Sequence, residues 1–214
     1  MIIIGIDLSG PSNYQQTAVA CFEKRGKRLL YSNSMVGADD RVIYDLISER
    51  SHSHEAVIGL DAPLSYNIGG GDRNRDAQLR RLVVEAGLPS GSVMTPTMTR
   101  TCYLTLRGIS VARSLELIKP RPPRLVEVHP GASLALRGAS VRDIRTLKED
   151  VLARLNLLKF LGDQGLEGVG SVGVTSHHLI SACAAALSAW AWSSGKSVWL
   201  AQADPPYHPY DFAC

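Results

Sequence analysis

The stretch Ile2-Ile3-Ile4-Gly5-Ile6-Asp7 sets the pattern from which the fold can be predicted. An unbroken apolar run of this kind is typical of a strand that is buried on both faces, in a sheet covered by helices. Similar strands follow at Ala56-Val57-Ile58-Gly59-Leu60-Asp61 and at Arg124-Leu125-Val126-Glu127-Val128. Each carries a carboxylate, which costs free energy in such a strand unless it is paired, hydrogen-bonded or bound to a metal. These three acidic residues could therefore converge on one cation.

The remaining elements are those of an α/β protein. Further strands are predicted at 17–23, 28–35 and 197–201, and helices at 39–50, 72–86, 109–119, 146–162 and 176–192. The first three strands form an antiparallel meander, and strands 56–61 and 124–128 join it in parallel through helical crossovers. This is the order of the ribonuclease H-like fold, in which strands 2–7 and 56–61 are neighbours. We predict one such domain over residues 1–214, with a helical and loop insertion at about 64–122.

Several local features are predicted within this frame. Asp72 is expected to be the N-cap of helix 72–86, and residues 94–101 to be a loop that could cover a site. Helix 146–162 is expected to bury a stripe formed by Leu147, Val151, Leu155 and Leu158. The proline-rich tail is expected to be loosely held.

Composition restricts the class of protein. Hydrophobic residues make up 45% and charged residues 20% of the 214 residues, as in ordinary globular proteins. No apolar run approaches the roughly 20 residues of a membrane span, and no basic leader suggests a signal peptide. The four cysteines lack metal-binding spacing and are expected to be reduced thiols in the cytoplasm. A net charge of +3 permits a polyanionic partner without requiring one, and the oligomeric state stays open.

Asp7 and Asp61 are the strongest candidate pair. Each follows a glycine by two positions, so Gly5 and Gly59 share a strand face with the carboxylates and are expected to leave room for a cation, its waters or a phosphate. Hard ions such as Mg²⁺ or Mn²⁺ prefer oxygen ligands, and two of them could clamp a phosphodiester. The alternative is structural: Asp7 caps a turn at the amide of Ser9 or Gly10, and Asp61 restrains the following loop.

Glu127 and His129 lie two positions apart and therefore on one strand face. The carboxylate could be a third metal ligand, and the imidazole could face a phosphate. The alternative is a structural ion pair between Glu127 and one of the arginines, with His129 packed before Pro130.

The last predicted helix begins with His177 and His178, and Ser181 lies one turn later on the same edge. Either histidine could ligate a metal or activate water near neutral pH. The alternative is that both are structural first-turn residues.

Basic residues could guide a phosphate backbone to the carboxylates, because arginine forks match phosphate oxygens. The candidates are Arg75, Arg80, Lys148 and Arg154. The alternative is a solvated helix face whose arginines pair with Asp72, Asp76 and Glu85.

Together these segments resemble the DUF429 family, whose members are described as predicted nucleases of the ribonuclease H-like fold. The matching segments are Gly5-Ile6-Asp7, Ile58-Gly59-Leu60-Asp61-Ala62-Pro63, Arg75-Asp76 with Arg80, Val126-Glu127-Val128-His129-Pro130, Lys148 with Arg154, and the small-residue helix from His177. The resemblance implies a ribonuclease H-like domain with an insertion after strand 56–61 and a site built from Asp7, Asp61 and Glu127. Where the family usually carries acidic residues in the last helix, this chain has His177, His178 and Ser181. A serine cannot replace a charged ligand, so the departure implies a less negative site with room for one metal ion instead of two.

Three functions are compatible with these residues. The first is a nuclease that depends on Mg²⁺ or Mn²⁺ and hydrolyses DNA or RNA, with Asp7, Asp61 and Glu127 as ligands and His177 or His178 as ligand or proton carrier. The second is a nucleic-acid-binding protein of the same fold that has lost catalysis. The third is a nucleotide-binding phosphotransferase of the actin and sugar-kinase group, whose first phosphate loop Gly5–Gly10 resembles, although that group normally needs two such domains.

Overall fold

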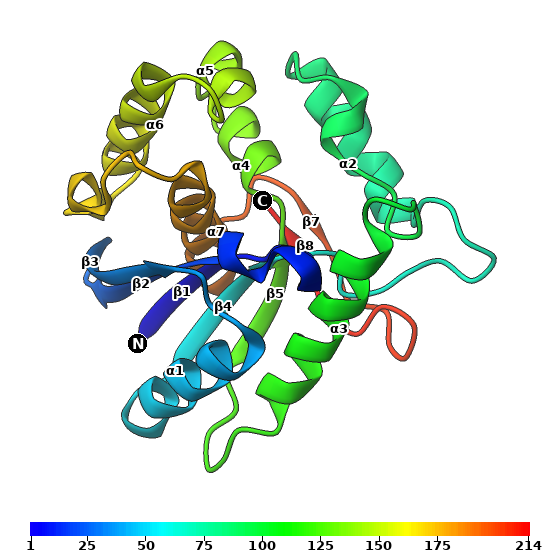
Figure 1. Cartoon of the computed structure of the whole chain (residues 1–214), viewed down its shortest axis with the longest axis horizontal. Helices are drawn as coiled ribbons and strands as arrows, with labels where there is room; N and C mark the ends of the chain where they lie inside the picture. Colours follow the sequence, from blue (N-terminus) through cyan, green and yellow to red (C-terminus); the bar gives the residue numbers. More distant parts are fainter.

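The computed structural model describes all residues from Met1 to Cys214 and shows one mixed, eight-stranded sheet with helices on both faces (Figure 1). The strands are β1 (Ile2–Asp7), β2 (Ala18–Arg25), β3 (Arg28–Val36), β4 (Ala56–Asp61), β5 (Arg124–Val128), β6 (Leu166–Glu167), β7 (Leu200–Ala201) and β8 (Phe212–Ala213). Their order across the sheet is β6-β3-β2-β1-β4-β5-β8-β7. The fold is therefore α/β, as predicted.

The central strands pair as the sequence predicts. β1, β2 and β3 form an antiparallel meander, β4 runs parallel to β1, and β5 runs parallel to β4. In this register Asp7 lies opposite Asp61. Because parallel strands end at the same edge of the sheet, both carboxylates are brought to one edge.

The outer strands differ from the prediction. The predicted strand 197–201 is reduced to β7, and β8 lies between β5 and β7. The predicted loosely held stretch around Pro205, Pro206 and Pro209 contains no strand, but the residues after it are part of the sheet. The reason is burial: Phe212 and Cys214 pack with Leu79 and Ala132 in a small apolar cluster.

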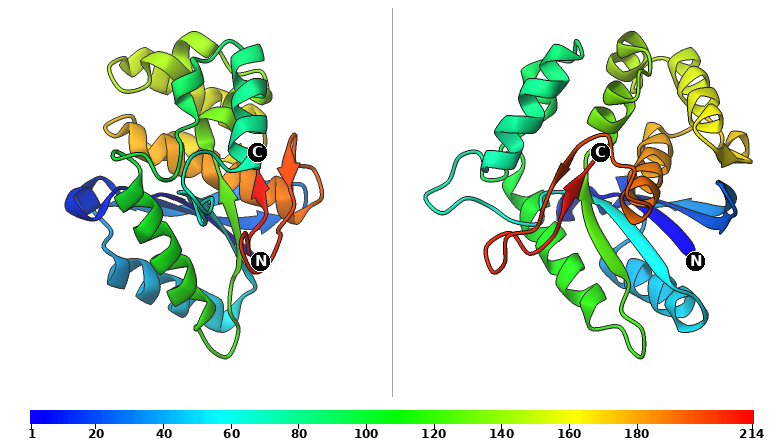
Figure 2. Two further views of the ribbon diagram at one scale, coloured as in Figure 1. Left: turned by 90° about the vertical axis from the view of Figure 1, so that its right-hand side faces the viewer. Right: turned by 180° about the vertical axis from the view of Figure 1, so that it is seen from behind.

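Two helical layers sandwich the sheet. The helices are α1 (Asp40–Ser53), α2 (Asn74–Glu85), α3 (Cys102–Glu116), α4 (Pro130–Leu136), α5 (Val141–Thr146), α6 (Val151–Asp163) and α7 (His177–Ser193), with short 3₁₀ turns at Pro11–Gln16, Ser90–Ser92 and Val169–Val172. Helices α1 and α3 lie on one side of the sheet, and α7 with α4 and α6 lies on the other (Figure 2). Alternate residues of β1 serve the two layers, since Ile3 belongs to the α7 cluster and Ile4 to the α1 cluster.

The predicted helix 146–162 is shorter in the structure, because residues 147–150 form a turn after α5 and α6 begins only at Val151. The Asp150 carboxylate accepts a hydrogen bond from the Leu152 amide and starts α6 anew. The predicted stripe is consequently wrong at two positions, because the Val151 and Leu155 side chains are exposed while Leu158 is buried.

Two other helix boundaries differ. Helix α3 begins at Cys102 instead of 109, because the buried polar side chains of Thr105 and Arg107 obscure its apolar pattern. Helix α2 begins after Arg73, so Asp72 is not its N-cap but pairs with Arg80.

The interpretation of Gly5 and Gly59 as space for a cation is wrong. A Cβ atom at Gly5 would lie 1.9 Å from the Ala182 carbonyl oxygen, and one at Gly59 would lie 2.4 Å from that of Ala185. Both glycines therefore allow α7 to approach the sheet more closely than any side chain would permit. Their function is packing, which fixes the start of α7 beside the ends of β1 and β4.

The four cysteines are free thiols, and the chain has seven α-helices. None of the helices combines the length and the apolar character that crossing a bilayer would require. The predicted cytoplasmic location stays a prediction.

Candidate functional site

A cleft of about 610 Å³ opens where β1, β4 and β5 end and α7 begins. Eight of the residues predicted to form the site line it, and these are Asp7, Asp61, Glu127, His129, Lys148, His177, His178 and Ser181. The predicted loop also contributes, through Met94 and Arg100. Arg75, Arg80 and Arg154 are not among the lining residues. The sequence therefore located the cleft, but not every basic residue assigned to it.

Asp7 and Asp61 form a close pair of carboxyl groups in this cleft. Burial raises the pKa of Asp61 well above its usual value, and the Asp7 charge and a hydrogen bond with Asp7 raise it further. The two groups are thus close enough to share a proton, as like-charged neighbours do. The turn-capping alternative for Asp7 is not observed, because the Ser9 amide donates to Thr17 Oγ1 at 3.2 Å.

His178 connects α7 to Asp7. Its Nδ1 lies 2.7 Å from Asp7 Oδ2, and because an ionised carboxylate only accepts, Nδ1–H is the donor. The Nε2 atom is then the ring nitrogen that remains for proton exchange or ligation. His177 stacks beside His178 with the ring centroids 3.9 Å apart, and burial, followed by the His178 charge, lowers the pKa of His177.

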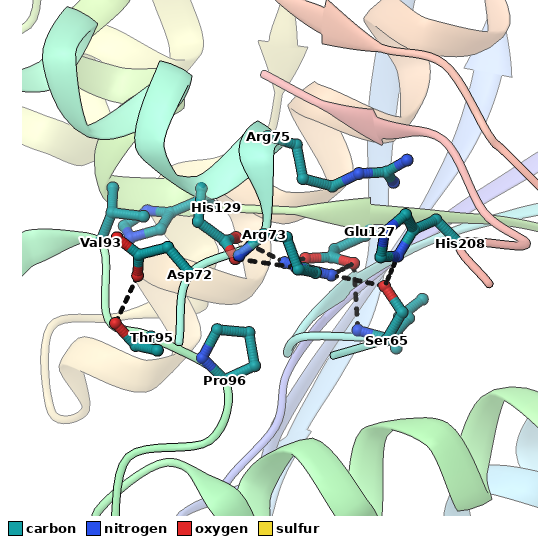
Figure 3. A network of polar contacts seen from close by, with 12 residues as sticks. Ser65, Asp72, Arg73, Arg75, Val93, Thr95, Pro96, Glu127, His129 and His208 are labelled. Atoms are coloured by element: carbon teal, nitrogen blue, oxygen red, sulfur yellow. Dashed lines mark hydrogen bonds and ion pairs between the residues drawn. The ribbon is translucent and has the colours of Figure 1, made fainter. Parts of the chain in front are cut away.

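Glu127 is bound by an internal cation. Arg73 Nη1 donates to Glu127 Oε2 at 2.8 Å, Arg73 Nη2 donates to Oε1 at 2.5 Å, and the Leu64 amide adds a third bond at 3.0 Å (Figure 3). The side chains of Arg73 and Glu127 are only 1% and 3% exposed. The ion pair with an arginine, which was the alternative for Glu127, is therefore what the structure contains.

The same arginine organises a larger network. Arg73 also binds both oxygens of Asp76, and its Nη1 reaches Ser65 Oγ at 2.9 Å. Ser65 Oγ in turn lies 2.8 Å from His208 Nδ1 (Figure 3). The network thereby ties the segment after β4, helix α2 and the C-terminal segment to β5.

His129 has both ring nitrogens engaged. Its Nδ1 accepts from the Ala132 amide at 3.1 Å, so Nε2 carries the proton and donates to the Ser92 carbonyl at 2.7 Å. Burial lowers the pKa of His129, which favours the same neutral form. The ring caps α4 and holds the 90–92 turn while it lines the cleft.

The predicted phosphate-binding arginines hold the backbone. Arg75 donates to the carbonyls of Tyr210 and Gln202, and Arg80 binds Asp72 and the Val93 carbonyl. Arg154 donates to the Leu147, Lys148 and Val174 carbonyls around the break between α5 and α6.

Lys148 itself is exposed, forms no ion pair and lines the cleft. The guanidinium of Arg154 therefore positions Lys148 through its backbone. Arg100 is a second exposed, unpaired cation at the cleft, on the loop predicted to cover a site.

Sequence reasoning missed the roles of Arg73 and Arg107. Arg107 is buried and donates to the Ser9 carbonyl at 2.7 Å, to Thr17 Oγ1 and to Asp40, and it thereby fixes the loop after Asp7. Both arginines stand among other arginines of the insertion, and no local pattern separates a buried one from an exposed one. The weak signal for Arg73 was its position three residues before Asp76, just outside the family-like segment Arg75-Asp76.

The aspartate pair is suited to a hard divalent cation. No group of three or more His, Cys, Asp or Glu side chains forms a metal cage. Mg²⁺ is commonly held by one or two carboxylates, together with waters and substrate phosphates. The raised pKa of Asp61 reports a negative charge that lacks a partner, and a bound cation would relieve it. The donor set of Asp7 and Asp61 therefore fits Mg²⁺ or Mn²⁺.

Comparison with known proteins identifies the family. The model of a family described as "Protein of unknown function (DUF429)" matches residues 5–205. This chain belongs to the DUF429 family. The match includes all three strand carboxylates and the start of α7, so the family assignment from the sequence is confirmed. Searches of curated proteins and of solved structures gave no match.

Proposed function

We propose that this DUF429 protein is a nuclease that hydrolyses phosphodiester bonds with Mg²⁺ or Mn²⁺ held by Asp7 and Asp61. One observation carries the proposal: the two carboxyl groups lie opposite each other in adjacent parallel strands at the edge of a cleft, and no lysine or arginine pairs with either. Buried Glu127, by contrast, is neutralised. Two adjacent carboxylates in a cleft that no lysine or arginine neutralises are the arrangement that a divalent cation stabilises.

The chemistry divides among residues of the cleft. When bound, the ion would supply charge stabilisation at the phosphodiester and lower the pKa of a water molecule. His178 orients Asp7 through its Nδ1–H and offers Nε2 for a proton. Lys148 and Arg100 are free to bind substrate phosphates, because neither forms an internal ion pair.

The strand order supports the finer proposal of a ribonuclease H-like domain, with residues 64–122 as its insertion. The role of Glu127 as a third ligand also stays a proposal. Its carboxylate already accepts three hydrogen bonds, so it would need to keep a lone pair for the ion or exchange one bond. Its charge, which raises the pKa of Asp61, strengthens the negative field in either case.

The test is a cleavage assay with single-stranded DNA, duplex DNA, RNA and a branched junction. We expect cleavage of at least one substrate with Mn²⁺, none with chelator, and a loss of about 100-fold or more in Asp7→Asn. Asp163→Asn, which removes an exposed and unpaired carboxylate, is the matched control and should retain activity. Cleavage that persists in chelator or in Asp7→Asn would refute the mechanism.

A second candidate function is nucleic-acid binding without catalysis. It is favoured by Ser181, which lines the cleft where a carboxylate would strengthen a metal site, and by the engagement of Glu127 with Arg73. Salt-dependent binding in Mn²⁺ without cleavage of any substrate would establish this function instead. No observation favours the phosphotransferase, and it stays a prediction from the Gly5–Gly10 loop.

A further inference from the structure

A second concave site lies at the far end of α7 from the cleft. Its volume is about 430 Å³, and it is formed by the β2–β3 turn and the C-terminal ends of α4, α6 and α7. Helix α7 has 17 residues and begins at the cleft, so the two sites are about 25 Å apart. Its lining includes the side chains of Lys24, Lys27, Arg137, Lys196, Leu187 and Trp190.

The four basic residues of this pocket have no acidic partner. Lys24, Lys27, Arg137 and Lys196 form no ion pair, and no aspartate or glutamate lines the pocket. Arg137 donates only through Nε, to Ser133 Oγ at 3.3 Å, and its Nη2 is buried without any partner. Unpartnered buried polar groups are rare in folded proteins, and each one requires an explanation.

Helix ends explain only part of this charge. Arg137 is the C-cap of α4, and Gln164 and Ser194 are the C-caps of α6 and α7. Each helix C-terminus is equivalent to about half a negative charge, so the three together offset about one and a half of the positive charges. More than half of the positive charge therefore remains available to an anion.

The wall of the pocket adds an apolar surface. Leu187 and Trp190, on successive turns of α7, lie beside the basic residues. A concave site of this volume, in which polar groups converge beside an aromatic wall, can hold a small molecule. Arginine forks and lysine amines together suit a ligand with several phosphate oxygens.

We propose that this pocket binds a small organic diphosphate, with its phosphates at Lys24, Lys27, Arg137 and Lys196 and its organic group against Trp190 and Leu187. The site is separate from the aspartate cleft and does not depend on the nuclease proposal. Arg137 supplies a half-buried positive charge, and the exposed lysines at the rim attract the phosphates from solvent.

Calorimetric titration with ADP and with inorganic pyrophosphate, in chelator and at constant ionic strength, tests the proposal. We expect saturable 1:1 binding of both probes, with ADP the tighter because its ring system can contact Trp190. The double variant Lys24→Met/Lys196→Met should weaken binding about tenfold, and both lysines are exposed, so folding should be preserved.

Two matched variants localise the effect. Lys119→Met/Lys159→Met removes two exposed lysines elsewhere and should change affinity less than twofold, and Asp7→Asn should leave ADP binding unchanged. Absence of saturable binding, equal loss in both lysine double variants, or binding of ADP that is no tighter than that of pyrophosphate would overturn the proposal. Binding confined to a single-stranded oligonucleotide would overturn it in favour of a nucleic-acid surface.

Discussion

The carboxylates at the ends of β1, β4 and β5 have two opposite kinds of surroundings. Glu127, with Asp76, surrounds the guanidinium of Arg73 in a network that solvent barely reaches. Asp7 and Asp61 face a cleft, contact each other, and have a histidine as their only ion-pair partner. The sequence pattern is nearly the same in the two cases. A carboxylate at a strand end therefore indicates a metal site only where no lysine or arginine neutralises its charge.

Arg73→Met should have the largest effect, because it leaves two buried carboxylates without a partner. We expect the free energy of unfolding to fall by about 3–5 kcal/mol, measured by urea denaturation. Arg41→Met, which breaks an exposed pair with Asp45, should change it by less than about 0.5 kcal/mol. Equal effects of the two variants would mean that the buried ion pairs of Arg73 contribute no more to stability than an exposed ion pair.

Gly5→Ala tests whether Gly5 serves the packing of α7 against the sheet. The new Cβ would collide with the α7 backbone at Ala182, so we expect a loss of about 1–3 kcal/mol by the same assay. Gly10→Ala is the control, since a Cβ there meets no atom within 4 Å. A neutral Gly5→Ala would restore the interpretation that this glycine leaves space for a ligand.

Asp61→Asn should stabilise the metal-free protein by about 1 kcal/mol or more at neutral pH, because it removes a buried charge that also lies beside the like charge of Asp7. The folded pKa of Asp61 lies above its unfolded value, so the folded protein binds more protons between the two values and loses stability as pH rises through that window. The advantage of the variant should therefore appear above about pH 4 and become constant above the raised pKa.

Thermal unfolding in chelator across this pH range checks the prediction, and Asp163→Asn should show no such pH-dependent gain. Added Mn²⁺ should stabilise the wild type and not Asp61→Asn, because only the former can bind the ion tightly. Destabilisation by Asp61→Asn in chelator would show that this carboxylate has a structural role like that of Glu127.

His178→Gln should have the smallest effect. It keeps a hydrogen-bond donor for Asp7 but removes the proton-exchanging Nε2, so we expect Mn²⁺ affinity to fall about tenfold at most. Calorimetry with Mn²⁺ measures this change in affinity. A change as large as that of Asp7→Asn would make His178 a ligand instead of a positioning residue.

The sequence predicted the central fold because long apolar strands and their order are local signals. Strands β1, β4 and β5 match residue for residue, and their register places Asp7 beside Asp61. Strand β8 could not be predicted, because two residues carry no periodicity and their burial depends on α2.

The sequence predicts where the site lies, but not which partner each of its side chains has. Strand ends are visible in the sequence, whereas the partners of each carboxylate depend on contacts between distant segments. Arg73 lies 54 positions before Glu127, and nothing in the sequence distinguishes it from neighbouring Arg75, which binds the C-terminal backbone instead. The glycines were misinterpreted for the same reason, since α7 approaches them from 177 positions along the chain in the case of Gly5 and Ala182.

The most direct test of the central claim is a crystal soaked in Mn²⁺ and measured for anomalous scattering. We expect a peak within coordination distance of both Asp7 and Asp61, with Glu127 still paired to Arg73 or sharing one oxygen with the ion. A fully soaked crystal with no peak at these aspartates, or with the ion bound elsewhere, would contradict it.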